Sequence, residues 1–206
     1  MTFAAVLSDL DGVLVDSGDA VERVWREWAV ERGLDPDDVG RASHGVPGRQ
    51  VIERVAPELD AAAEASRVDR LHAATGGSAL PGAAELLATV SPLAVVTSCS
   101  PPLAAARFAA AGLTPPSVLI TSDLTPRGKP FPDPYLAAAS ALGVEPGRCL
   151  VIEDAPAGIA AARAAGMAVW AVTTTHSASE LAADRLAADV RALLPALRSR
   201  QPTAAG

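Results

Sequence analysis

The sequence predicts an α/β protein whose core is a parallel, doubly wound sheet. Two observations support this fold class. Short apolar runs alternate along the chain with helix-like segments, a pattern typical of a parallel sheet covered by helices. The rhythm breaks once, between residues 16 and 80, where charged helix-like segments follow one another without a strand. We therefore expect two domains: a core of residues 1–15 and 81–206, and an all-α cap of residues 16–80.

Five short apolar runs, each followed by polar residues, are the predicted strands of the core. They are residues 3–7, 93–96, 118–120, 150–152 and 168–172. Helices are predicted at residues 101–111, 134–142, 157–165 and 179–186. The first two begin with an N-cap residue followed by proline, and the first three are followed by glycine, which favours the end of a helix.

The inserted segment contains three predicted helices, at residues 21–30, 49–55 and 61–73. Gly18 and the pairs at residues 76–77 and 81–82 are candidate hinges, although they are equally compatible with plain turns. Trp25 and Trp28 lie three residues apart, so we expect them to form the small core of the cap rather than a stacking platform for a sugar.

Composition excludes several function classes. The 206 residues are 50% hydrophobic, which argues against disorder, and the net charge of −7 without a basic patch makes nucleic acid and anionic membranes poor partners. No stretch predicts a membrane span or a signal peptide, and the two cysteines lie in unlike contexts. We expect a cytoplasmic enzyme acting on a small metabolite, as a monomer or weak homodimer.

The polar residues that follow the predicted strands are the candidate functional residues. Ligands of open α/β sheets bind beyond the carboxyl ends of the strands, so these side chains should converge at one edge. The set consists of Asp9, Asp11, Thr97, Ser98, Lys129, Glu153 and Asp154. Gly12 directly follows the two aspartates of the first strand.

Three or four carboxylates at one edge of a sheet need a cation. Oxygen ligands with partly open coordination suit Mg²⁺, which also takes a substrate phosphate. Lys129 is the single lysine beside 16 arginines, so its position requires a compact ammonium. We interpret Asp9 as an ionised nucleophile and Asp11 as a general acid/base. Taken alone, the two aspartates would also fit a turn, Lys129 a solvated loop, and Asp154 a helix N-cap.

Four motifs in order resemble the haloacid dehalogenase superfamily of phosphotransferases. They are DLDGVLVDS (9–17), VVTS (95–98), GKPFPDPY (128–135) and VIEDAPAGIAAARAAG (151–166), and together they span nearly the whole chain. The resemblance implies a Rossmann-like core with a helical cap inserted after the first motif. It also implies an aspartyl-phosphate on Asp9, with Asp11 as general acid/base.

The resemblance assigns the remaining site residues as well. Thr97 with the Ser98 amide would bind phosphate, although either hydroxyl of this pair fits, and Lys129 would steady the nucleophile and the phosphate. Asp9, Asp154 and the carbonyl of Asp11 would hold Mg²⁺, with Glu153 direct or through water. Gly12 is a further predicted phosphate contact.

Members of this superfamily with such second and fourth motifs are similar to phosphatases of small sugar and polyol phosphates. A hexose-phosphate mutase of the β-phosphoglucomutase type is the first alternative. The mutase relatives carry a histidine soon after motif one and a cap lysine, whereas this cap has no lysine. A catalytically silent phosphosugar-binding protein is the second alternative.

Residues of the cap are expected to set specificity. His44 and Arg49 lie in a polar loop, HGVPGR, that resembles the loop of the family facing the active site. Each is balanced between a substrate contact and an ordinary surface role. Cys99 is predicted to be a small buried residue, and His72 and His176 are predicted to be solvated.

Overall fold

The computed structural model describes residues 2–43 and 45–199. Within this part of the chain, six parallel strands form one sheet with the order β5-β4-β1-β6-β7-β8. The strands are β1 (Ala5–Ser8), β4 (Leu93–Val96), β5 (Val118–Ile120), β6 (Cys149–Glu153), β7 (Ala168–Val172) and β8 (Arg185–Ala187). The predicted α/β fold class is confirmed, and β1 lies at the centre of the sheet, between β4 and β6.

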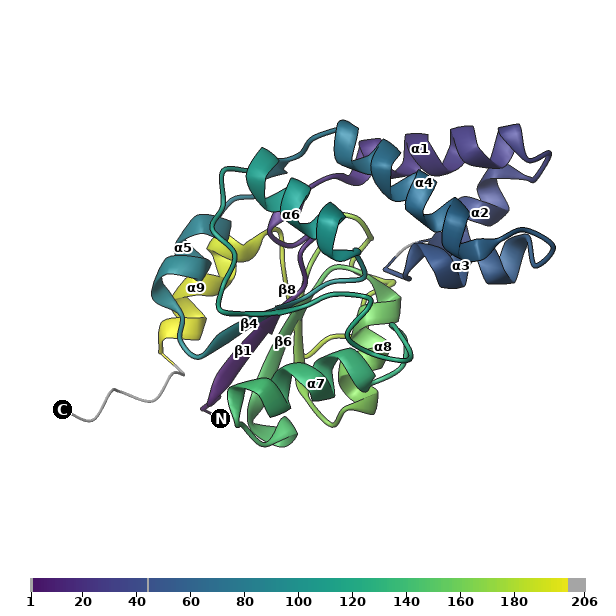
Figure 1. Ribbon diagram of the computed structural model, residues 1–206. Coiled ribbons are helices and arrows are strands. Elements are labelled where there is room, and N and C mark those ends of the chain that lie inside the picture. The colour runs from purple at the N-terminus through teal and green to yellow at the C-terminus, as the bar shows by residue number, and fades with distance from the viewer. Residues whose placement is uncertain (1, 44, 200–206) are drawn as a thin grey trace.

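Helices cover both faces of the sheet (Figure 1). One face packs against α5 (Ala83–Thr89), α6 (Pro101–Ala110) and α9 (Val190–Arg198), and the other against α7 (Asp133–Leu142) and α8 (Pro156–Ala164). Successive residues of β1 alternate between the two faces: Val6 belongs to the first apolar core, and Ala5 and Leu7 to the second. This two-sided burial explains the continuous apolar runs of the strands.

The cap is a separate helical lobe beside the sheet (Figure 1). It contains α1 (Gly18–Glu31), α2 (Pro36–Ser43), α3 (Gly48–Val55) and α4 (Ala61–Ala74). The chain enters and leaves it through two antiparallel strands, β2 (Val15–Asp16) and β3 (Ser78–Ala79). Trp25 and Trp28 pack edge to face in its apolar core, with ring centroids 5.6 Å apart, as predicted. Helix α2 was not predicted.

The predicted helix at residues 179–186 is wrong. Residues 185–187 instead form β8, which pairs with β7 in parallel. Asp184 explains the difference, because its backbone amide donates to Val169 O at 2.7 Å and its carboxylate accepts from Val169 N at 2.8 Å. Arg163 of α8 also pairs with this carboxylate. These contacts tie the segment to the sheet edge and exclude a helix.

Helices α5 and α9 were also missed, although both cover the sheet. The tail of residues 200–206, which we expected to be frayed, lies outside the described residues. Among the helices that the structure describes, none has the length and apolar character needed to cross a membrane.

Candidate active site

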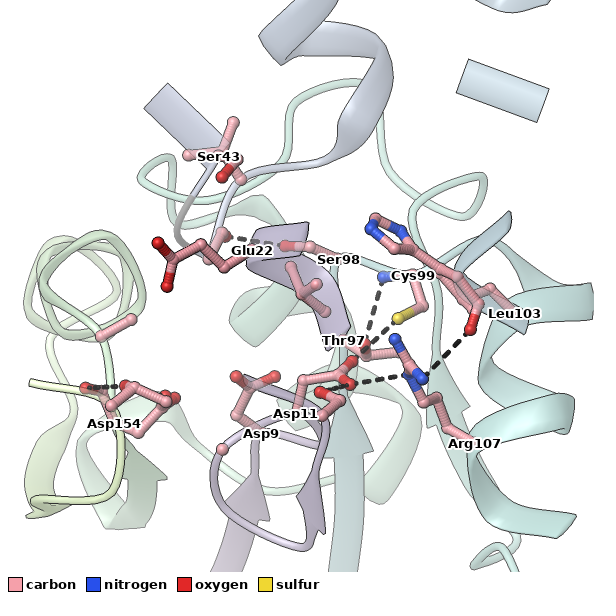
Figure 2. A pocket seen from close by; sticks show the side chains of 18 of the residues that line it. Asp9, Asp11, Glu22, Ser43, Thr97, Ser98, Cys99, Leu103, Arg107 and Asp154 are labelled. Atoms are coloured by element: carbon pink, nitrogen blue, oxygen red, sulfur yellow. Dashed lines mark hydrogen bonds and ion pairs between the residues drawn. The ribbon is translucent and has the colours of Figure 1, made fainter. Parts of the chain in front are cut away.

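The ends of three adjacent strands form the floor of a cavity of about 430 Å³ between core and cap. Asp9 follows β1, Thr97 follows β4 and Asp154 follows β6, while Lys129 lies in the loop between β5 and α7. Figure 2 shows four of the residues at this floor, which lie from left to right in the order Asp154, Asp9, Asp11 and Arg107. The predicted convergence at one sheet edge is therefore what the structure shows for these residues.

Lys129 lies directly behind the proposed nucleophile. Its ammonium is 2.8 Å from Asp9 Oδ1 and 2.7 Å from Glu153 Oε1, and it donates to Val96 O at 3.2 Å. Only 1% of the residue is exposed. Burial opposes its charge, but the two carboxylates raise the pKa of Lys129 above its usual range, so it is a permanent cation.

Burial is the dominant influence on Asp9. It raises the pKa of Asp9 to about 7, with Lys129 opposing the rise and the Glu153 carboxylate adding to it. A carboxylate in this position needs a further cation to be fully ionised at neutral pH. The electrostatics of the site thus favour a bound divalent ion beside Asp9.

Glu153 is wholly buried, and both of its carboxylate oxygens have protein partners. Oε1 accepts from Lys129 and, at 2.6 Å, from the hydroxyl of Tyr135, and Oε2 accepts from the amides of Asp154 and Ala155 at 3.0 and 3.3 Å. Although burial opposes ionisation, Lys129 holds the pKa of Glu153 below its usual range. Glu153 is placed to orient Lys129. Tyr135 was not singled out, although it ends the third motif.

Three buried carboxylates at this edge of the sheet fit a hard divalent cation. Asp9, Glu153 and Asp154 each offer an oxygen, and these oxygens lie within 4.8 Å of one another. Asp154 Oδ1 is buried and accepts no hydrogen bond from any described residue, while Oδ2 accepts from the Thr175 hydroxyl. Burial raises the pKa of Asp154 well above its usual range, as expected for a buried carboxylate that forms no ion pair with the described residues. Thr175 belongs to the polar end of the fifth predicted strand but was not identified as a site residue.

Asp11 has a different environment from Asp9. Its Oδ1 accepts from the Ser17 hydroxyl and lies 3.0 Å from Arg107 Nε, and its Oδ2 accepts from the Cys99 thiol at 3.0 Å. Burial raises the pKa of Cys99 well above its usual range, so the thiol is a neutral donor, in agreement with the prediction of a buried residue. The ion pair with Arg107 was not predicted.

The phosphate-binding candidates also line the cavity. Thr97 is 4% exposed, and its hydroxyl accepts from the Cys99 amide at 3.1 Å, whereas the Ser98 hydroxyl donates to Gly45 O in the cap at 2.8 Å. The Thr97 hydroxyl keeps its own proton available for a ligand. Gly12 has φ +78°, and a side chain at this position would collide with the Asp154 carboxylate.

The cap wall of the cavity differs from expectation. Arg49 does not line the cavity: it is exposed and pairs with Glu53 at 2.8 Å. His44 lies outside the described residues. The prediction that His72 is solvated is wrong, because the residue is 5% exposed and its ring packs edge-on to Trp25. Burial, with Arg107 adding, lowers the pKa of His72 to about 4, so the ring is neutral.

A parallel α/β core, a helical cap inserted after the first strand, and an aspartate pair whose first member contacts a buried lysine define a capped phosphate-processing hydrolase. Residues 3–166 match the haloacid dehalogenase-like hydrolase family, and the chain belongs to this family. It is accordingly a phosphoric monoester hydrolase, as its named relatives are.

Two curated relatives and one solved structure illustrate the similarity. The chain is 46% identical over 178 residues to hexitol phosphatase A of Escherichia coli (strain K12), covering 81% of each chain. It is 39% identical over 204 residues to validoxylamine A 7'-phosphate phosphatase of Streptomyces hygroscopicus subsp. limoneus, covering 91% of this chain and 94% of the relative. The crystal structure of a hydrolase from Pseudomonas syringae superimposes with a TM-score of 0.83 at 27% identity, covering 97% of this chain and 100% of that one.

Proposed function

We propose that the chain is a Mg²⁺-dependent phosphatase that hydrolyses small phosphorylated sugars or polyols through an aspartyl-phosphate on Asp9. One observation carries the proposal. Asp9 borders the cavity with its Oδ1 bound by the buried Lys129, while the nearby Asp154 offers a carboxylate oxygen without a partner among the described residues. This arrangement provides a nucleophile, its counter-charge and a ligand for a metal.

The residues support a two-step transfer. An oxygen of Asp9 attacks phosphorus while the bond to the leaving oxygen breaks, and Asp11 gives its proton to that oxygen. Water then attacks phosphorus, Asp11 takes the proton of this water, and the Asp9–phosphorus bond breaks to release inorganic phosphate. Lys129 and Thr97 bind phosphate oxygens throughout. Asp9, Asp154 and the carbonyl of Asp11 would hold Mg²⁺, which supplies positive charge beside the transferring phosphoryl group.

The cap wall supports a leaving group without a second phosphate. The side chains that line it include the carboxylates of Asp16, Glu22 and Asp69, and no lysine or arginine from the described cap residues. Carboxylates accept hydrogen bonds from hydroxyl groups and repel anions, so a polyol or sugar fits this wall better than a bisphosphate. The names of the two curated relatives, a hexitol phosphatase and a phosphatase of a 7'-phosphate, agree with this substrate class.

Phosphate release from a panel of hexitol, glycerol and hexose phosphates tests the proposal. We expect release with Mg²⁺ and none with EDTA, and loss of turnover in Asp9→Asn with an unchanged circular dichroism spectrum. Asp38→Asn, an exposed cap residue, is the matched control. Turnover by Asp9→Asn would contradict the covalent step, and absence of release from p-nitrophenyl phosphate would favour a silent binding protein.

The same panel separates a mutase from a phosphatase. With a hexose bisphosphate as activator, a mutase would yield isomerised hexose phosphate in place of free phosphate. The cytoplasmic location and the monomeric or weakly dimeric state stay predictions.

A further inference from the structure

Arg107 is a buried charge that the reaction described above does not use. It lies on α6, a helix of the core, and only 1% of it is exposed. A buried guanidinium costs several kcal/mol unless it is paired and hydrogen-bonded, so its partners identify what the position is for. The ion pair that the structure gives it is with Asp11, at 3.0 Å between Nε and Oδ1.

The other end of the same guanidinium contacts the cap. Nη1 donates to His72 O at 3.3 Å and to Gly76 O, and it lies 3.5 Å from the Thr75 hydroxyl. His72 is in the last turn of α4, and Gly76 is in the segment that returns from the cap to β3. These carbonyls carry the negative end of the α4 dipole, which a cation stabilises. One side chain of the core thus connects the predicted acid/base to the return segment of the cap.

The surroundings of α6 allow this connection. Leu103, Ala104 and Phe108 anchor the helix in the core of the sheet domain, while its neighbour across the domain boundary is α4 of the cap. Figure 2 places Arg107 on the side of Asp11 that is remote from Asp9 and Asp154. Arg107, which also lines the cavity, therefore contacts Asp11 from the side away from Asp9 and leaves the side toward Asp9 open.

We propose that Arg107 is a positioning residue that fixes the Asp11 carboxylate for proton transfer and couples its orientation to the cap. The inference rests on the phosphatase reaction proposed above. General acid catalysis depends on placing the carboxyl within hydrogen-bond reach of the leaving oxygen. The planar guanidinium suits this task, because Nε forms an ion pair with the carboxylate while Nη1, in the same rigid plane, donates to carbonyls of the cap.

The leaving group gives the proposal a specific signature. An alkoxide, such as the one a polyol phosphate releases, is a poor leaving group and needs a proton in the transition state. p-Nitrophenolate leaves without one. A substitution of Arg107 that displaces the Asp11 carboxylate should therefore slow hydrolysis of an alkyl phosphate far more than hydrolysis of p-nitrophenyl phosphate.

Kinetics of Arg107→Gln and Arg107→Lys on glycerol phosphate and p-nitrophenyl phosphate test this. For Arg107→Gln we expect kcat on glycerol phosphate to fall about 100-fold, within the range of general acid catalysis, with KM changed less than about threefold. The loss on p-nitrophenyl phosphate should be at least about tenfold smaller. Arg107→Lys keeps the cation and the stem but not the fork, so it should lie between wild type and Arg107→Gln.

A double-mutant cycle with Asp11→Asn shows whether Arg107 acts through Asp11. If it does, Arg107→Gln causes no further loss of kcat in the Asp11→Asn background. Arg163→Gln, which removes an exposed arginine paired with Asp184, is the control and should leave both substrates unaffected. If Arg107→Gln lacks the native circular dichroism spectrum, the two-substrate comparison and the double-mutant cycle are carried out with Arg107→Lys.

Two results would overturn the proposal: equal losses on both substrates, or the same loss in Asp11→Asn as in the wild type. Either would mean that Arg107 does not act through Asp11. Failure of the wild type to hydrolyse glycerol phosphate would count against the proposed substrate class instead. In that case phenyl phosphate replaces glycerol phosphate as the poorer leaving group, and the comparison with p-nitrophenyl phosphate still tests Arg107.

Discussion

Lys129 shows at the residue scale how composition can indicate a site. In a chain with 16 arginines and one lysine, the lysine is the residue with carboxylate oxygens at 2.7 and 2.8 Å and almost no exposure. Lys129 also donates to Val96 O. A guanidinium is larger and planar, so it cannot replace the ammonium among these three oxygens without displacing Asp9 or Glu153. The single lysine is thus explained by geometry that an arginine does not satisfy.

Lys129→Arg is therefore expected to be a severe change. We expect kcat for phosphate release to fall on the order of 10²-fold, comparable to the loss of one transition-state hydrogen-bond donor. Steady-state kinetics measure this, and Arg163→Lys at an exposed ion pair is the control exchange. Activity within a few-fold of wild type would show that Lys129 has no direct role at the phosphate.

His72 should make stability depend on pH. Its pKa is about 4 in the folded protein, against 6.5 as the ordinary value, because burial and Arg107 disfavour the charged ring. Between these values the unfolded chain binds a proton that the folded chain does not, so the free energy of unfolding falls as pH falls through this window. The loss between pH 7 and pH 5 from this residue is about 2 kcal/mol.

Urea denaturation of the wild type and His72→Gln at the two pH values measures this contribution. The variant should lose less stability on acidification by that amount. An identical pH dependence in both proteins would mean that the ring is accessible to protons in the folded state.

Residues that follow strands could be predicted from the sequence, and residues that act across the domain boundary could not. Asp9, Thr97 and Asp154 follow recognisable apolar runs, and the ends of neighbouring parallel strands must meet. Arg107 and His72 are brought together from a helix of the core and a helix of the cap. Nothing in either helix indicates the partner, because the contact depends on how the cap sits on the core.

At the scale of elements, the start of α8 is packed against the buried pair of Lys129 and Glu153. Gly158 lies in the first turn of α8, where a Cβ would collide with the carboxylate of Glu153. Glu153 cannot move away, since both of its oxygens are bound by protein groups. The glycine in the fourth motif is thereby explained by close approach of the helix to the strand that precedes it.

Gly158→Ala should accordingly lower both stability and activity. We expect a loss of about 1–3 kcal/mol in the free energy of unfolding, typical of overpacking, and a reduced kcat because Lys129 shifts with Glu153. Gly40→Ala in α2 is the matched control: nothing lies within 4 Å of its Cβ, so the exchange should stabilise by up to about 1 kcal/mol. Chemical denaturation and phosphate release measure the two effects, and equal stabilities would contradict the packing argument.

The error at residues 179–186 has the same physical origin as the missed cross-domain contacts. The segment SELAADRL contains good helix formers, and local propensity favours a helix. The hydrogen bonds of Asp184 to Val169 and its ion pair with Arg163 are tertiary, and they outweigh this preference. The strands with apolar runs and the helices that begin with an N-cap residue and a proline were predicted well, because these signals are local.

For the whole molecule, the insertion of the cap between β2 and β3 determines what closes the site. The core carries the candidate catalytic residues, while Glu22, Trp25 and Asp69 of the cap line the opposite wall. A break in the strand–helix rhythm was enough to predict the insertion. It was not enough to predict which cap side chains line the cavity, since Arg49 faces solvent and His72 is buried.

A bound divalent ion should stabilise the whole fold, because it offsets the repulsion between buried carboxylates that meet at the sheet edge. With Mg²⁺ at about 100 times its Kd, linkage adds roughly 2.7 kcal/mol to the free energy of unfolding, or about 5–10 °C in Tm for a chain of this size. Asp154→Asn should abolish this shift, and in EDTA it should melt at a temperature equal to or above that of the wild type, since one buried charge is removed. Calorimetry with and without Mg²⁺ measures both effects, and Asp38→Asn should retain the full Mg²⁺ shift. An undiminished Tm shift in Asp154→Asn would mean that Mg²⁺ binds elsewhere. The stabilisation by Mg²⁺ would then not come from the carboxylates at the sheet edge.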